Sequence, residues 1–177
     1  MSQKLEIAQL GNPILRRCAQ PVKQVNNPQI QTLIDDLILT VDQTHGVGIA
    51  APQVSVSDRL FIVASRPNLR YPHAPTMEPT AMINPLIVNC SGEPVKGWEG
   101  CLSVPGMRGL VPRYPVITVE YTSRDGKLHQ VELTDFVARI FQHELDHLDG
   151  KVFLDRVEKT EDLMSESEYQ KQMITNL

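Results

Sequence analysis

The sequence lacks the features that mark several classes of protein. No run of apolar residues is long enough to span a bilayer, so we expect no membrane insertion. The first residues contain neither the apolar core and cleavage site of a signal peptide nor the arginines of a transit peptide. Only three cysteines occur in 177 residues, an odd and small number that argues against a disulfide framework. These absences indicate a cytoplasmic protein, in which Cys18 and Cys90 are expected to be small buried apolar side chains.

Positive charge is also in short supply. Seventeen Lys and Arg against 21 Asp and Glu give a net charge of −4, and no basic cluster offsets it. We therefore expect no direct binding of nucleic acid. A chain of this length can bury a sizeable core within one domain. The prediction is a single domain over residues 1–177, in which residues 156–177 form a polar C-terminal tail or helix.

Two helices are predicted from periodic apolar positions. The first covers residues 28–44, begins at the capping pair Asn27-Pro28 and is ended by Gly46. The second begins after Thr134 as N-cap and runs to Gly150, a residue type that suits the position after a helix. Residues 1–27 contain prolines and no periodic pattern, so we expect them to be irregular.

Apolar segments bounded by turn residues predict strands. The expected strands are near Leu60–Ala64, near Ala81–Val88 with an interruption at Pro85, at Val116–Thr122 and at Lys127–Leu133. Asp125-Gly126 indicates a two-residue hairpin turn between the last two. Four prolines make residues 66–80 an expected exposed loop. The fold class is therefore α+β, with antiparallel strands packed around a central helix.

A candidate metal site lies on the second helix, in the pattern His-Glu-Leu-Asp-His at residues 143–147. Histidines four residues apart differ by only about 40° around a helix, so His143 and His147 can reach one ion from the same face. Glu144 lies beside them and can hold a water molecule and accept its proton. Phe136 and Ile140 continue the same stripe, which indicates a core-facing, metal-binding helix and not a solvated one carrying two surface histidines.

Two imidazoles leave a metal short of ligands, and the chain offers several candidates for the third. The histidine that metzincin proteases use is replaced here by Phe153. Gluzincin proteases use a later glutamate, but Glu166 and Glu168 lie in the polar tail. Cys101 lies beside a glycine in a small-residue segment, which suits close approach to an ion. A thiolate and two imidazoles leave a fourth position for water, as in a catalytic site, whereas Cys90 would be needed to close a structural one.

Three separated segments resemble the three motifs of peptide deformylases. They are Gly-Val-Gly-Ile-Ala-Ala-Pro-Gln at 46–53, Glu-Gly-Cys-Leu-Ser at 99–103 and Gln-His-Glu-Leu-Asp-His-Leu-Asp-Gly at 142–150. Residues 10–16 and 108–113 are also similar to that family, so the resemblance covers nearly the whole chain to about Asp155. It implies a hydrolase that removes the formyl group from the N-terminal N-formylmethionine of new polypeptides and releases formate. These nascent peptides are then the expected partners, and a transient contact with the ribosome is left open.

The resemblance also assigns roles in the chemistry. The metal ligands that it implies are Cys101, His143 and His147. The ion is one divalent metal per chain, with Fe²⁺ as the physiological one and Zn²⁺, Ni²⁺ or Co²⁺ as replacements in a purified sample. Glu144 would act as general base and then as general acid. Gln53 and the backbone N–H of Leu102 would hold the formyl oxygen as negative charge develops on it.

Substrate contacts are expected on both sides of the metal. The resemblance implies that backbone groups of Val47, Gly48 and Gly100 pair with the peptide as an added strand. Phe136 and Ile140 lie one and two turns before the first histidine of the metal helix, so we expect them to form an apolar pocket for the methionine side chain.

Some assignments stay open from the sequence alone. Arg113 is either an ion-pair partner or a substrate contact, Arg108 has no assigned role, and Glu99 either helps to close the pocket or caps a turn. Two other functions compete with deformylation. One is a gluzincin-like endopeptidase that uses a glutamate of the tail, and the other is a metal-stabilised binding module without catalysis. A hydrolysis assay separates the three.

Overall fold

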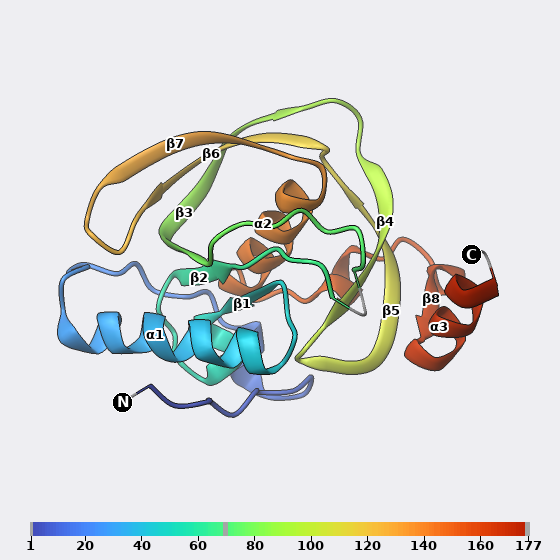
Figure 1. Ribbon diagram of the computed structural model, residues 1–177, viewed down its shortest axis with the longest axis horizontal. Helices are drawn as coiled ribbons and strands as arrows, with labels where there is room; N and C mark the ends of the chain where they lie inside the picture. Colours follow the sequence, from blue (N-terminus) through green and yellow to red (C-terminus); the bar gives the residue numbers. More distant parts are fainter. Residues whose placement is uncertain (1, 69–70, 176–177) are drawn as a thin grey trace.

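The computed structural model describes residues 2–68 and 71–175 and contains two antiparallel sheets (Figure 1). The larger sheet has the strand order β1 (Gly48–Ala50), β2 (Leu60–Val63), β3 (Thr80–Ser91), β6 (Val116–Thr122) and β7 (Leu128–Thr134). The smaller sheet has the order β4 (Val95–Cys101), β5 (Val104–Arg113) and β8 (Leu163–Ser165). The helices are α1 (Pro28–Gln43), α2 (Asp135–Leu148) and α3 (Glu166–Thr175).

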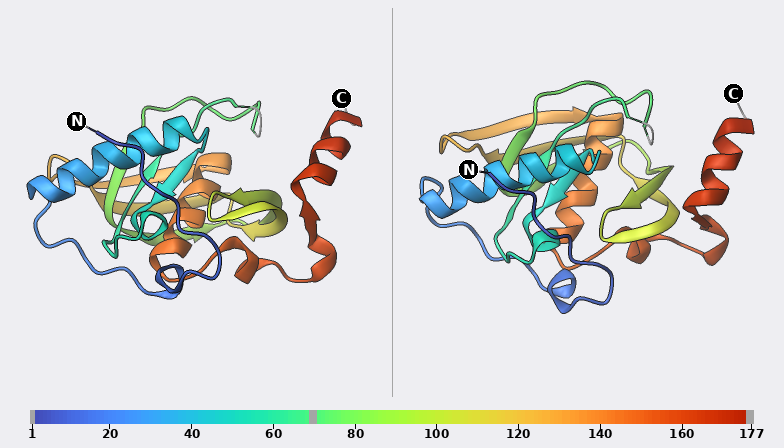
Figure 2. Two further views of the ribbon diagram at one scale, coloured as in Figure 1. Left: turned by 90° about the horizontal axis from the view of Figure 1, so that it is seen from below. Right: turned by 60° about the horizontal axis from the view of Figure 1, so that its bottom comes forward.

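Helix α2 lies at the centre of the molecule, and the predicted α+β fold is confirmed. The strands β3, β6 and β7 curve over α2, while β4 and β5 flank it (Figure 1). Helix α1 packs on β1 and β2, and α3 lies beside β5 at the opposite end of the molecule (Figure 2). Short 3-10 helices connect these elements: η1 (Pro13–Arg16), η2 (Ala51–Val54), η3 (Phe153–Arg156) and η4 (Thr160–Asp162).

Strand β2 separates two parts of the hydrophobic core. Leu60 and Ile62 pack with the apolar face of α1, whereas Phe61 and Val63 pack with α2 and the larger sheet. Successive side chains of a strand point to opposite faces of the sheet. Because β2 is buried on both faces, all of its side chains must be apolar, and Leu60–Val63 form such a continuous apolar segment. Each such side chain contributes about 1.5–3 kcal/mol when it is fully buried. The strand that leads to the site is thus fixed from both sides.

Helix α1 agrees with its prediction to within one residue. The Asn27 side chain accepts a hydrogen bond from the backbone N–H of Gln29 at 2.9 Å, and Pro28 occupies the first turn. The helix ends at Gln43, and its C-terminal left-handed residue is His45, with a φ of 52°. Gly46 was expected in that place, but it instead donates its backbone N–H to Val41 O at 3.0 Å.

Helix α2 ends where the sequence predicts. Gly150 follows it with a φ of 72°, and a Cβ there would lie 2.8 Å from backbone atoms of Arg16, so only glycine fits. At the other end, Thr134 occupies the N-cap position, but its side chain makes no capping hydrogen bond. The polar tail also contains the expected helix, α3, preceded by β8.

Other local predictions were wrong. The hairpin between β6 and β7 has a five-residue connection, 123–127, because Gly126 has a φ of 82° whereas Asp125 does not take the left-handed conformation that a two-residue turn requires. Cys18 and Cys90, expected to be buried, are exposed. The predicted interruption at Pro85 is a register shift inside one long strand, β3.

No helix in the described part of the chain has both the length and the apolar character that crossing a bilayer requires.

Candidate metal centre and active site

The two histidines of α2 and the cysteine at the end of β4 converge on one point. The ligand atoms of Cys101, His143 and His147 all lie within 4.8 Å of one another, and Cys101 Sγ is 3.2 Å from His147 Nε2. Tetrahedral zinc, with bonds of about 2.3 Å to sulfur and about 2.0 Å to nitrogen, places such donor atoms roughly 3.5 Å apart. One thiolate and two imidazoles at this separation fit a single metal ion with an open fourth position.

The cysteine lies in surroundings that favour its thiolate form. Burial raises the pKa of the Cys101 thiol, but the neighbouring His147 and His143 outweigh burial and hold that pKa well below its usual range. The backbone N–H of Ser103 and the side-chain amide of Gln53 also donate to Sγ, at 3.4 and 3.5 Å. Because the thiolate is the form that ligates metals, this arrangement fits a metal-bound cysteine.

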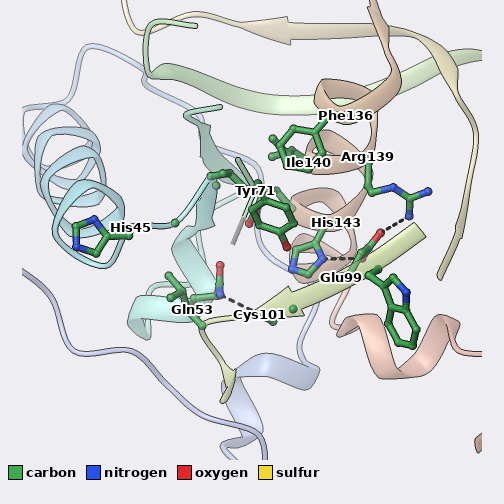
Figure 3. A pocket seen from close by; sticks show the side chains of 16 residues that line it. His45, Gln53, Tyr71, Glu99, Cys101, Phe136, Arg139, Ile140 and His143 are labelled. Atoms are coloured by element: carbon green, nitrogen blue, oxygen red, sulfur yellow. Dashed lines mark hydrogen bonds and ion pairs between the residues drawn. The ribbon is translucent and has the colours of Figure 1, made fainter. Parts of the chain in front are cut away.

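A buried ion-pair network orients one of the two imidazoles. Nδ1 of His143 lies 2.9 Å from Glu99 Oε2, so Nδ1 donates and Nε2 is left to face the site (Figure 3). Arg113 donates to both oxygens of Glu99 at 2.9 and 3.0 Å, and Arg139 donates to Oε1 at 2.9 Å. Burial raises the pKa of Glu99, but its hydrogen bond to His143 and the charge of Arg113 hold that pKa well below its usual range.

The same network resolves two alternatives that the sequence left open. Arg113 is 5% exposed and also donates to Asp146 at 2.6 Å, so it is an ion-pair partner. Glu99 contacts the imidazole of His143 while lining the pocket, and it does not cap a turn. Its role depends on β4 crossing the first turn of the metal motif, a contact between residues 44 positions apart.

Glu144 faces the space beside the three ligand atoms. It is 4% exposed, and its Oε2 has no hydrogen-bond partner among the described residues. Burial raises the pKa of this carboxyl to about 7. Buried carboxylate oxygens are normally hydrogen-bonded, so an unpaired one on a residue that lines the pocket indicates a bound water or ligand. A pKa near neutrality suits a group that both accepts and returns a proton.

Gln53 is held with its amide nitrogen toward the site. Its Oε1 accepts the backbone N–H of Ala50 at 2.9 Å, and its Nε2 donates to Ser103 Oγ at 3.1 Å. The N-terminal segment fixes Gln53 and its partner Ser103, because Ala8 N–H donates to Gln53 O at 2.8 Å and Leu10 N–H donates to Ser103 O at 2.7 Å. Gln53 therefore reaches the pocket from η2, just after β1, with its amide nitrogen beside the Cys101 sulfur.

One pocket unites the residues that the sequence singled out. Among those residues, the ones that line it are Val47, Gly48, Gln53, Gly100, Cys101, Leu102, Phe136, Ile140, His143 and Glu144, whereas His147 is not part of the lining. The structure adds residues that sequence reasoning did not find: His45, Tyr71, Trp98 and Arg139. The Tyr71 ring lies 4.9 Å from that of Phe136 and covers the apolar part of the pocket (Figure 3). Tyr71 comes from the proline-rich loop, where no pattern in the sequence indicates a pocket residue.

This arrangement of side chains defines the class of the protein. Three protein ligands that leave one coordination position free, with a buried carboxylate beside them, are typical of a mononuclear metal-dependent hydrolase. The free position takes the water that attacks the substrate. The ligand spacing, the ionised Glu99 and the unpaired Glu144 oxygen all suit such an ion.

Comparison with known proteins narrows the class. The sequence model of polypeptide deformylases matches residues 4–162. A peptide deformylase 2 of Nostoc sp. is 64% identical over 97% of this chain and 96% of its own length. The Met-Ala-Ser-bound class I type b peptide deformylase of Acinetobacter baumannii has a TM-score of 0.86 and 45% identity, covering 89% of this chain and all of that one. An actinonin complex of a Synechococcus elongatus peptide deformylase has a TM-score of 0.78 and 31% identity, covering 92% of this chain and 86% of that one.

This chain belongs to the polypeptide deformylase family. It is a hydrolase that removes the N-formyl group from newly synthesised polypeptides, as its resemblance to that family implied. The family depends on a metal, and the Cys/His/His group is where this chain can hold one.

Proposed function

We propose that the deformylation site consists of one divalent metal held by Cys101, His143 and His147, with Glu144 as the group that moves the proton. The observation that carries this proposal is the unpaired, buried Glu144 oxygen beside three convergent ligand atoms. The ion would supply Lewis-acid activation of water and of the formyl carbonyl. Glu144 accepts the proton of the attacking water and then delivers it to the departing amine nitrogen.

The formyl oxygen is stabilised from two directions. Gln53 Nε2 and the backbone N–H of Leu102 donate to it as it gains negative charge. The hydrogen bonds of Gln53 to Ala50 and Ser103 fix that amide before the substrate arrives, so little reorganisation accompanies the reaction. Removal of one preorganised donor of this kind lowers the rate by about 10²–10³-fold.

The peptide binds between two strand edges. β1 ends the larger sheet, β4 ends the smaller one, and both contribute residues to the pocket. Backbone groups of Val47, Gly48 and Gly100 can therefore pair with an extended substrate. Phe136 and Ile140 receive the methionine side chain, an unbranched group that adapts to an apolar wall. The Met-Ala-Ser bound to the Acinetobacter baumannii relative supports a ligand of this length.

The proposal also includes the identity of the ion, the location of the protein and its partners. Fe²⁺ is the physiological ion, and Zn²⁺, Ni²⁺ or Co²⁺ can replace it during purification. The chain acts as a single domain in the cytoplasm on N-formylmethionyl nascent peptides. Because its substrate emerges from the ribosome, a transient ribosome contact belongs to the same proposal.

The test is release of formate from formyl-Met-Ala-Ser, with metal content measured on the same sample. We expect turnover at one metal per chain and its loss when the metal is removed by a chelator. Turnover that persists without metal would contradict the proposed site. Cleavage of an internal bond in an unformylated peptide would instead identify an endopeptidase.

A further inference from the structure

The C-terminal segment is attached to the pocket wall through one buried arginine. Arg108 on β5 is 0% exposed, and its Nε and Nη2 donate to the Glu166 carboxylate on α3 at 2.6 and 3.1 Å. A guanidinium without access to water requires an ionised partner, because an uncompensated buried charge is strongly destabilising. Glu166 provides that charge in the bidentate geometry that a planar guanidinium favours.

Arg108 in turn contacts both sides of the substrate pocket. Its Nη1 donates to the Tyr71 hydroxyl at 3.1 Å, and Tyr71 packs on Phe136 with ring centroids 4.9 Å apart. On the other side, the guanidinium lies against Gly100, where a Cβ would be only 3.1 Å from Cζ. Tyr71, Phe136 and Gly100 all line the pocket, and Figure 3 shows Tyr71 in front of its apolar wall. The position of Arg108 therefore sets the distance between the two sides.

A second contact ties α3 to the same place. The Tyr169 ring lies 5.6 Å from that of Trp98, a pocket residue, and 4.7 Å from Arg108 Cζ. Stacking of a guanidinium on an aromatic face adds to its ion pair. Helix α3 thus holds Arg108 by charge and by packing, at a site outside the metal centre.

We propose that Glu166 is a positioning residue for substrate selectivity, which acts by holding Arg108 so that Tyr71 closes the pocket for the first side chain of the substrate. This inference rests on the proposed function and extends it to the C-terminal segment. Without the Glu166 charge, Arg108 turns toward water and releases the Tyr71 hydroxyl. The pocket wall then loosens, and an unbranched methionine side chain loses its advantage over a smaller one.

The test compares Glu166→Gln with Glu168→Gln. Both variants remove one negative charge from the same helix, but the Glu168 side chain is 56% exposed and its carboxylate pairs with Lys171 at the surface. The measured quantity is the ratio of kcat/KM for formyl-Met-Ala-Ser to that for formyl-Ala-Ala-Ser. We expect Glu166→Gln to lower this ratio by about tenfold, mainly through a higher KM for the methionyl peptide, and Glu168→Gln to leave it unchanged.

Tyr71→Phe provides an independent arm that leaves the buried ion pair intact. It removes only the hydroxyl that accepts from Arg108, so we expect a smaller fall in the ratio, and no additional fall when it is combined with Glu166→Gln. If Glu166→Gln does not fold, the Tyr71→Phe ratio decides alone. An unchanged ratio in the folded variants, or an equal change in Glu168→Gln, overturns the inference. Failure of the unmodified chain to deformylate either peptide would overturn the proposed function instead.

Discussion

Gly48 and Glu144 are packed so closely that one added methyl group should disable the proposed base. A Cβ at Gly48 would lie 2.4 Å from Glu144 Oε1 and 2.9 Å from its Cδ, where ordinary contacts begin at 3.4 Å. The backbone of Gly48 is not in the left-handed region, so alanine itself is not strained there. Glu144 is 4% exposed and enclosed, so its carboxylate must move by about 1 Å, a misplacement that can cost about 10²-fold in rate.

The assay for Gly48→Ala is kcat on formyl-Met-Ala-Ser with metal content determined in parallel. We expect kcat to fall by about 10²-fold at unchanged metal stoichiometry, because the three atoms nearest to a Cβ at Gly48 all belong to Glu144 and not to a ligand residue. Ile49→Val is the matched control, since the next residue of β1 faces the core on the α1 side. That change should reduce stability by about 0.5–1.5 kcal/mol and leave kcat intact. A Gly48→Ala enzyme with near-normal kcat would show that the position of Glu144 does not depend on the absence of a side chain at residue 48.

Three further outcomes are expected. Cys101→Ala should abolish tight metal binding, and elemental analysis that finds one metal per chain in this variant would remove Cys101 from the site. Glu99→Gln removes the anionic partner of His143 and one of the two carboxylates that pair with Arg113, so metal affinity should fall by about 10–100-fold and stability by about 3–5 kcal/mol in denaturant titrations; wild-type values for both would contradict the role of the network. Acetyl-Met-Ala-Ser should be cut at least about 10² times more slowly than the formyl peptide, because the extra methyl displaces the carbonyl from Gln53, and comparable rates would refute a tight formyl site.

The elements that the sequence predicts well are those with local and repeated signals. Helix α1 has a capping pair and an apolar stripe, and α2 has a terminal glycine whose conformation no other residue adopts easily. The three residues proposed as metal ligands, which the fold brings together, belong to this group as well. Two lie on one helix face at fixed spacing, and the third lies in a short segment of small residues. A metal site can therefore be predicted from the sequence without knowledge of the fold.

The strands β4 and β5 escaped prediction because their composition is unusual for strands. They contain Gly97, Gly100 and Gly109, at positions where a Cβ would lie 2.7–3.1 Å from a side-chain atom of Arg139, Arg108 or Phe153 respectively. Glycine is depleted in strands, so a segment selected for such close packing has no apolar alternation to detect. These strands are instead determined by the side chains that pack against the glycines, and those side chains lie far away in the sequence.

The same reason explains the site residues that were missed. Tyr71 enters the pocket from a proline-rich loop and is held by Arg108, 37 positions away. Arg139 is a half-buried residue of α2 whose partners are carbonyl groups of β4 and β5 and the carboxylate of Glu99. A sequence read alone contains no information on which of its charged residues meet, and so it left Glu99 and Arg113 between two roles each.

Glu144→Gln is the variant that separates proton transfer by Glu144 from metal binding by its neighbours. Glutamine keeps the shape of the side chain but cannot accept a proton at neutral pH. Formate release from formyl-Met-Ala-Ser and metal content should be measured on the same preparation. We expect one metal per chain with kcat lower by about 10²–10⁴-fold. A variant that holds its metal and turns over at the rate of the unmodified chain would contradict this expectation.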